Sequence, residues 1–312
     1  MTEEFDFADH IDGAPLPARL RAGAVWHYTT ADGLLGILSS NHLWASAPQV
    51  LNDSSEVLFG VELVREVLDE LESTVLPPAF HSYLRRVVDE SWVASIQSSC
   101  FVISASTEND LLNQWRYYAN ADGFAVGFDT SGSWGTRSVV SGVGGRTPVP
   151  TIFTPVVPGW HSVEYDRQAQ RRSARNALLF GTIKPPTASD NWLEDSDEWD
   201  EIVGHTRLLL NTVPLTVKHP AFSDEREVRY IGGASNNQVR FRTAGGRIVP
   251  YTTVAALDRQ ESADEPDRQF PLLGVMCGPG CRPGTTDIVA RALKHYGFAN
   301  VPVKTSDAPL SL

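Results

Sequence analysis

Two glutamates and an arginine alternate in the segment DEREVRYIGG, at Glu225, Glu227 and Arg229. Successive side chains of a β-strand point to opposite faces, so these three share one face, while Val228 and Tyr230 face the core. Two neighbouring carboxylates raise each other's pKa unless a cation lies between them. Arg229 is such a cation, and it can hold Glu227 ionised through a charge-assisted hydrogen bond. A carboxylate held in this way can stabilise positive charge that develops on a substrate.

A second polar group lies near the N-terminus, in the segment AVWHYTTADGLLGIL. The strand alternation places Trp26 and Tyr28 on one face and His27 and Thr29 on the other. The aromatic pair is expected to enter the core. We therefore expect His27 to face a cleft.

A third segment, CFVISASTENDLLNQWRYYAN, places Ser104 at the end of a strand and Trp115 and Tyr118 on the next helix. Residues three apart on an α-helix share a face, so both aromatic rings are expected to border one pocket and stack on a ligand ring. Burial of Trp115 in the core is the alternative. We predict that His27, Ser104 and Glu227 converge on one cleft, because each of them lies on a strand face opposite to its core-facing neighbours.

Strands and helices alternate irregularly along the chain, and the pattern is mostly strand from PLTVKH onward, with hairpin-like strands late in the chain. This order favours an α+β fold over a doubly wound parallel sheet. We expect one domain over residues 23–312, with two small antiparallel or mixed sheets around a cleft. Apolar residues at helical spacing predict a helical lobe at about 55–97. Residues 1–22 are expected to form an acidic arm, and the segment NDSSE offers Glu56 before the first long helix, where Asn52 or Asp53 could act as the cap.

The composition excludes several classes of protein. The 312 residues are 42% hydrophobic and 21% charged, as in globular proteins. A net charge of -12 argues against sequence-independent nucleic-acid binding, although a locally basic pocket is compatible with it. No apolar run approaches the roughly 20 residues of a membrane span. The acidic N-terminal segment lacks the apolar stretch of a signal peptide, so export is not expected. Three cysteines give no disulfide framework. We expect a cytoplasmic protein that does not enter a membrane; its oligomeric state is not indicated.

Several chemical motifs are missing from the sequence. It contains no phosphate-binding G-x-x-x-x-G-K-[ST], no G-x-S-x-G and no H-E-x-x-H. The cysteines of CGPGC have no second pair at metal spacing. We therefore expect no metal site.

The chain resembles the bacterial domain-of-unknown-function family 2971. WHYTTADGLLGILSSNHLWASAPQVLNDSSE is similar to the opening of that family, and CFVISASTENDLLNQWRYYANADGFAVGFD to its middle motif. KHPAFSDEREVRYI matches its E-x-E-x-R motif, and LLGVMCGPG its C-terminal part. The resemblance runs from about residue 25 to residue 306, and the family name supplies no activity.

A second, weaker resemblance does imply an activity. ADP-ribosyltransferases carry a first-strand His or Arg, a second strand with Ser or Tyr, and a late glutamate, often in E-x-E; H-Y-T, S-x-S and E-x-E occur here in that order. The resemblance implies NAD as substrate, with transfer to an unknown protein, nucleic acid or small-molecule acceptor, or hydrolysis. It implies Glu227, Glu225 and His27 as catalytic residues. The NAD-binding residues would be His27, Tyr28, Thr29, Ser104, Trp115, Tyr118 and Arg229.

Each feature also has a structural explanation when taken alone. His27 could be a half-buried, hydrogen-bonded histidine, and the E-R-E-V-R strand could be a salt-bridged edge. The alternative function is a non-catalytic nucleotide- or protein-binding module of a bacterial stress or defence system. A phosphodiester-cleaving enzyme is a third possibility, but it lacks a recognisable metal set.

Overall fold

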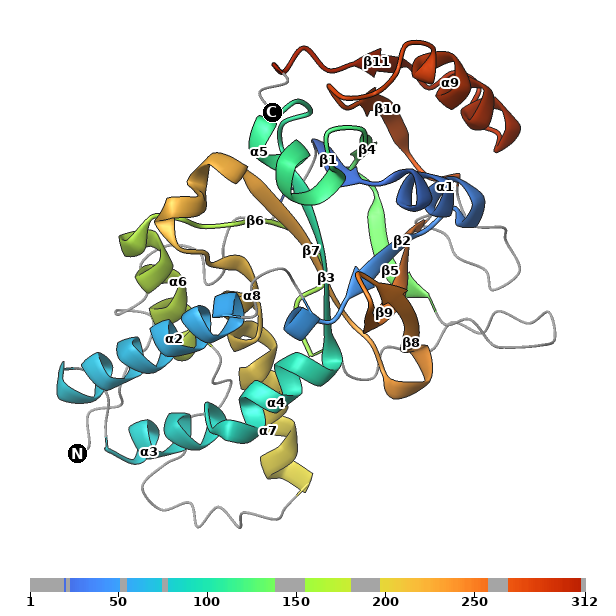
Figure 1. The fold of residues 1–312 in the computed structure, drawn as a ribbon. Coiled ribbons are helices and arrows are strands. Elements are labelled where there is room, and N and C mark those ends of the chain that lie inside the picture. The colour runs from blue at the N-terminus through green and yellow to red at the C-terminus, as the bar shows by residue number, and fades with distance from the viewer. Residues whose placement is uncertain are drawn as a thin grey trace.

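A computed structural model describes residues 20, 23–50, 55–74, 78–137, 155–180, 197–257 and 269–309 (Figure 1). The α-helices are α1 (Ala31–Ser40), α2 (Ser55–Thr74), α3 (Pro78–Val87), α4 (Glu90–Ser99), α5 (Leu112–Gln114), α6 (Arg167–Phe180), α7 (Asp197–Leu210), α8 (Thr212–Thr216) and α9 (Thr285–His295). The strands are β1 (Ala24–Thr29), β2 (Leu43–Ser46), β3 (Cys100–Ser106), β4 (Phe124–Asp129), β5 (Ser133–Arg137), β6 (Gly159–Ser162), β7 (Glu227–Gly233), β8 (Arg240–Ala244), β9 (Arg247–Leu257), β10 (Leu272–Cys277) and β11 (Val303–Thr305). The π-helix η3 (Trp115–Ala119) continues α5, and 3-10 turns cover Pro48–Val50 (η2), Pro220–Glu225 (η4) and Asn236–Gln238 (η5).

Within the described residues, eleven strands form one sheet, in the order β11-β10-β4-β1-β3-β2-β9-β5 with three further pairings. The pairings of named strands are antiparallel except for β10 with β11. The α+β class is confirmed. The expectation of two separate sheets is wrong, because β3 joins all the strands into one.

The sheet splits beside β3. One edge of β3 pairs along its length with β7. The other edge is shared by two strands: Ser106 pairs with Trp26 of β1, and Val102 pairs with Ser46 of β2. Because β1 and β3 share a single residue pair, the sheet opens immediately beyond it. Two limbs therefore diverge from one central strand.

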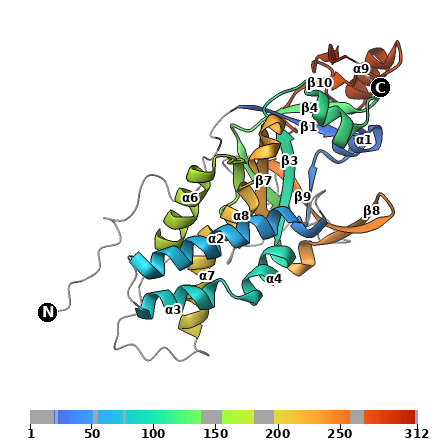
Figure 2. The same cartoon turned by 60° about the vertical axis from the view of Figure 1, so that its left-hand side comes forward.

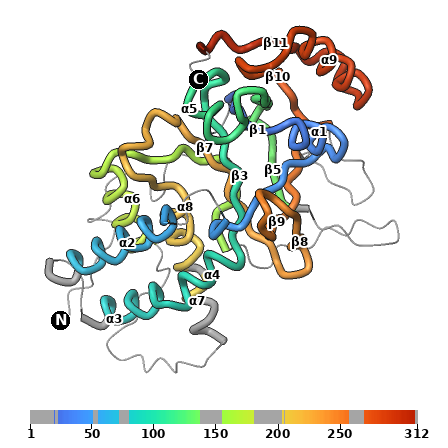
Figure 3. The backbone as a smooth tube through the Cα atoms, viewed as in Figure 1, coloured from blue at the N-terminus to red at the C-terminus, as the bar shows by residue number. Residues whose placement is uncertain are grey.

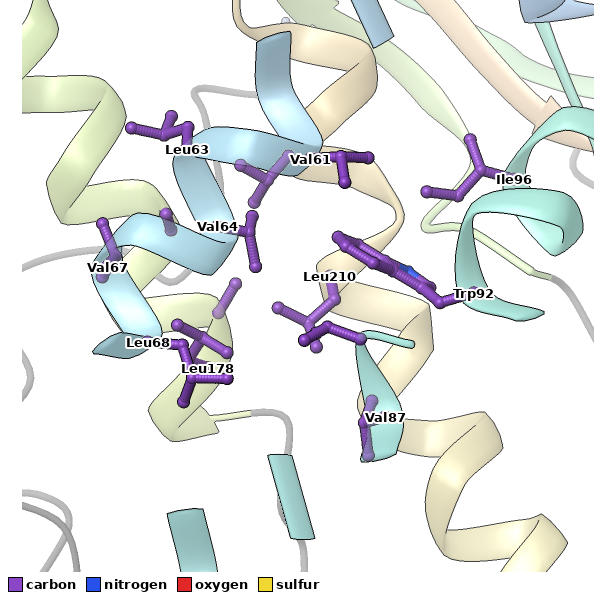
Figure 4. Packing of buried hydrophobic residues seen from close by; sticks show 14 of the residues in the cluster. Val61, Leu63, Val64, Val67, Leu68, Val87, Trp92, Ile96, Leu178 and Leu210 are labelled. Carbon is purple, nitrogen blue, oxygen red and sulfur yellow. The ribbon is translucent and has the colours of Figure 1, made fainter. Parts of the chain in front are cut away.

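The predicted helical lobe is present and larger than expected. Helices α2, α3 and α4 cover residues 55–99, and α6, α7 and α8 join them on one side of the sheet (Figure 2). Their apolar side chains converge on a common core, in which Trp92 packs near Leu210 and Val61 (Figure 4). Trp92 Nε1 donates to Asn211 Oδ1 at 2.5 Å, so the buried indole has its partner. Val102 and Ile231 of the sheet belong to this core, which fixes the lobe against β3 and β7.

The opposite face of the sheet carries a second core, which includes Ile103, Val126 and Val228. Helices α1 and α9 lie beside the β1–β4–β10 limb, away from the lobe (Figure 3). None of the described helices has the length and apolarity needed to cross a membrane. Several expectations lie outside the described residues: the arm at 1–22 apart from Leu20, the capping Asn52 or Asp53, the glycine-rich stretch at 138–154 and the acidic stretch at 181–196.

Candidate functional site

A cavity of about 60 Å³ lies beside the split in the sheet. It receives side chains from β1, β3, α5, η3, η4 and β7, which are far apart in the sequence. The prediction that His27, Ser104 and Glu227 converge is confirmed. The lining residues are His27, Tyr28, Ser104, Ala105, Gln114, Tyr118, Glu225 and Glu227.

His27 bridges the split. Its Nδ1 lies 2.8 Å from the backbone oxygen of Ser104, at a point where β1 no longer pairs with β3. A carbonyl oxygen only accepts, so Nδ1 carries the hydrogen and Nε2 of the neutral ring is an acceptor. Burial lowers the pKa of His27; Arg242 lowers it as well, and together they outweigh the hydrogen bond to Ser104. The imidazole is therefore mainly uncharged at neutral pH.

Glu227 is held by two cations. Arg229 Nε donates to Oε1 at 2.7 Å, and Nη2 donates to Oε2 at 2.9 Å; Lys218 Nζ also reaches Oε2, at 3.1 Å. Burial alone would raise the pKa of Glu227, but Arg229, Lys218 and the Ser104 hydroxyl lower it to about 2. Glu227 is therefore ionised at neutral pH, as the sequence predicted from Arg229.

Glu56, at the start of α2, ties the helical lobe to this site. Its Oε1 lies 3.0 Å from Lys218 Nζ, and its Oε2 forms an ion pair with Arg229. Lys218 and Arg229 have side chains only 2% exposed. Burial disfavours their charged forms, but the surrounding carboxylates raise both pKa values above the ordinary range. The two cations thus remain charged inside the protein.

Glu225 differs from Glu227. The prediction that both lie on one strand face is wrong, because Glu225 ends the 3-10 turn η4 and the left-handed backbone of Arg226 separates it from β7. Lys218 Nζ donates to its Oε2 at 2.6 Å, whereas no described residue donates to its Oε1. Burial, the largest influence, raises the pKa of Glu225 above its ordinary value despite Lys218. Two adjacent carboxylates whose pKa values are pushed in opposite directions are suited to different roles in one reaction.

The whole cluster carries an excess of negative charge. Glu56, Glu225 and Glu227 contribute three negative charges when ionised, and Lys218 and Arg229 contribute two positive charges, which leaves one negative charge. Tyr118 lines the same cavity, and burial raises its pKa to about 12, so this phenol keeps its hydroxyl proton. The cavity is therefore lined by the carboxylates of Glu225 and Glu227 and by the Tyr118 hydroxyl.

Tyr28 lines the cavity but also braces the following loop. It is 5% exposed, and its hydroxyl donates to the Glu108 carbonyl and accepts from the Leu111 N–H. Thr29 is not among the lining residues; its Oγ1 packs against Gly33 of α1. Ser106 is fully buried and donates to the Glu225 carbonyl at 2.9 Å, which fixes the turn that carries the carboxylate.

The expectation that Trp115 borders the cavity with Tyr118 is not met. Trp115 is 1% exposed, packs edge-on against Tyr28 and donates from Nε1 to Asp110 at 2.7 Å. Residues Trp115–Ala119 form a π-helix, whose wider turn rotates residues three apart away from one another. Trp115 thus faces the core while Tyr118 faces the cavity.

Sequence reasoning missed Lys218 and Gln114. Lys218 follows an apolar run in PLTVKHP, and a lysine that continues such a run was the available signal for a buried cation. Gln114 precedes Trp115, and no periodicity distinguishes it. Among the described residues, no three His, Cys, Asp or Glu side chains form a group that could hold a metal ion.

Comparison with known proteins supports one resemblance in the middle of the chain. No curated protein and no solved structure matches the sequence. A family model matches residues 114–230, which include Tyr118, Lys218, Glu225 and the start of β7 but not His27 or Ser104. The family is described as a protein of unknown function, DUF2971. The match supports the resemblance to that family over 117 of 312 residues.

Proposed function

We propose that the protein is an NAD-dependent ADP-ribosyltransferase or an NAD glycohydrolase. One observation carries the proposal: His27, Ser104 and Glu227, from three strands, line a single cavity together with Glu225, from the turn before β7. These are the positions that the resemblance to ADP-ribosyltransferases implies.

The charge distribution suits the chemistry of this reaction. When the bond between the ribose C1′ and the nicotinamide nitrogen breaks, the electron pair leaves with nicotinamide and positive charge develops at C1′. A fixed, ionised carboxylate stabilises that charge more in the transition state than in the ground state. Glu227 has this role, since Arg229 and Lys218 hold it ionised and immobile.

Glu225 is proposed to accept the proton of the attacking group. Water or an acceptor hydroxyl or amine forms the new bond to C1′ and loses one proton to a carboxylate. Glu225 Oε1 has no described donor, and the raised pKa of Glu225 makes it a better base than Glu227. His27 Nε2, an acceptor, is proposed to bind a ribose hydroxyl.

The cavity must enlarge to admit the nicotinamide ring. At about 60 Å³ it is smaller than the roughly 150 Å³ cavity that accommodates a benzene-sized ring. Tyr118 and Gln114 line the cavity and lie on the short α5–η3 segment. One of these two side chains must therefore move when NAD binds.

The test is nicotinamide release from NAD by purified protein, with and without cell lysate, beside calorimetric NAD binding. We expect release by the wild-type protein and, for Glu227→Gln, retained binding with turnover about 100-fold lower, the scale of losing one preorganised electrostatic partner. Glu66→Gln, which removes an exposed carboxylate of α2, is the matched control. The transferase proposal fails if wild-type protein neither binds NAD nor releases nicotinamide under any lysate condition.

A second candidate is a non-catalytic nucleotide- or protein-binding module. The observation that favours it is that both carboxylate oxygens of Glu227 are already occupied by Arg229 and Lys218. In that case Glu227→Gln lowers stability, and no NAD turnover exists for it to change.

A further inference from the structure

The lobe-side face of the sheet continues from the cavity onto β2 and β9. Ser104 and Val102 lie on the same face of β3, and Val102 pairs with Ser46. Ser46 in turn pairs with Tyr251 of β9. With strands about 4.8 Å apart and a rise of about 3.3 Å per residue, Ser46 lies roughly 8 Å from Ser104.

This part of the face carries an aromatic pair and an arginine. The rings of Trp44 and Tyr251 are 5.0 Å apart between centroids, and Trp44 is 40% exposed. Arg242 lies 5.5 Å from the Trp44 ring centroid and donates from Nη2 to Ser46 Oγ at 3.2 Å. We call Trp44, Ser46, Arg242 and Tyr251 the Trp44 surface.

Arg242 is a cation without a carboxylate partner in the described part of the chain. Its Nε is buried and has no hydrogen-bond acceptor among the described residues. Burial lowers the pKa of Arg242, and the group that opposes this effect is Tyr251, not a carboxylate. A guanidinium without a carboxylate partner is suited to bind an anion, and phosphate oxygens match its geometry. This contrasts with the net charge of -12 of the chain.

We propose that the Trp44 surface binds the ADP part of the dinucleotide, with the phosphates on Arg242 and the adenine stacked on Trp44. This inference rests on the proposed function, because it takes the cavity as the nicotinamide end. The exposed indole offers a face to a planar base. The nicotinamide ribose joins the phosphates of the ADP part to the nicotinamide in the cavity. The charge of Arg242 also contributes to lowering the pKa of His27, which lines the cavity.

ADP is the probe that tests this surface, because it lacks nicotinamide and needs no turnover. Calorimetry of ADP with the full chain should show binding that weakens about 10-fold or more in Trp44→Leu and in Arg242→Gln, since stacking and a charge-assisted pair each contribute on this scale. Phe241→Leu is the control for Trp44, since Phe241 is 68% exposed on the other face of the β8–β9 hairpin. Arg247→Gln, at the exposed turn of the same hairpin, is the control for the loss of charge.

Two results overturn the inference: no ADP binding by the wild type, or affinities within twofold of the wild type in both Trp44→Leu and Arg242→Gln. If NAD is cleaved but the two substitutions leave the ADP affinity unchanged, the proposed function stands and the inference falls. If ADP binds and depends on both residues while NAD is never cleaved, the inference stands and the proposed function falls. Thermal unfolding of each variant shows whether it is folded.

Discussion

Arg229 of β7 and Glu56 of α2 form an ion pair across 173 positions of sequence, inside the protein. It connects the strand that carries Glu227 to the longest helix of the lobe. Removing one partner of a buried pair leaves an uncompensated charge, which is more costly than losing an exposed pair.

Glu56→Gln should therefore lower the free energy of unfolding by roughly 3–5 kcal/mol. Glu66→Gln removes a carboxylate from the same helix, but its pair with Arg167 is exposed, so it should cost about 0–1 kcal/mol. Urea denaturation of both variants measures the difference. Equal costs would show that the buried network does not couple the lobe to the sheet.

Acid should destabilise the protein through Glu227. Its pKa is about 2 in the folded protein against an ordinary 4.5. A lowered carboxylate pKa contributes stability that is present above pH 4.5 and lost as the pH falls through about 2. Its size is on the order of 3 kcal/mol. Between pH 2 and 6, the unfolding free energy of Glu227→Gln should depend less on pH than that of the wild type. Glu66→Gln should show the same pH dependence as the wild type.

Trp115→Leu should act on stability and not on binding. The indole is buried against Tyr28 and bound to Asp110, so its loss should cost roughly 2–4 kcal/mol. Nucleotide affinity should remain within twofold of the wild type. Tyr118→Leu should show the reverse pattern, since Tyr118 lines the cavity. Calorimetry and thermal unfolding of the two variants separate these effects.

His27→Asn and His27→Ala should differ in stability. Asparagine places an amide donor near the position of Nδ1 and can keep the hydrogen bond to the Ser104 oxygen, whereas alanine leaves that oxygen without it. The alanine variant should be less stable by about 1–3 kcal/mol. Both variants lack Nε2. If Nε2 contacts the ribose, both variants should lose NAD turnover. Equal stabilities would contradict the bridging role of the ring.

Local patterns predicted the α+β class, the lobe beginning at residue 55 and the shared strand face of Glu227 and Arg229, but they wrongly extended that strand to Glu225. They predicted these features because strand alternation and helical spacing are properties of neighbouring residues. The single sheet was not predicted, since the joining of β1 and β2 to one edge of β3 depends on long-range pairing. Lys218 and Glu56 were missed as partners for the same reason. Trp115 was assigned to the wrong face because a π-turn leaves no periodic trace in five residues.

The hydrogen bond from His27 to Ser104 lets the ring titrate without turning. Nδ1 carries a hydrogen in the neutral and in the protonated imidazole, so acidification leaves that contact in place. Only Nε2 changes, from a lone pair to an N–H. A histidine anchored at one nitrogen thus inverts the polarity it presents to a bound molecule as the pH falls, while its hydrogen bond to Ser104 is kept.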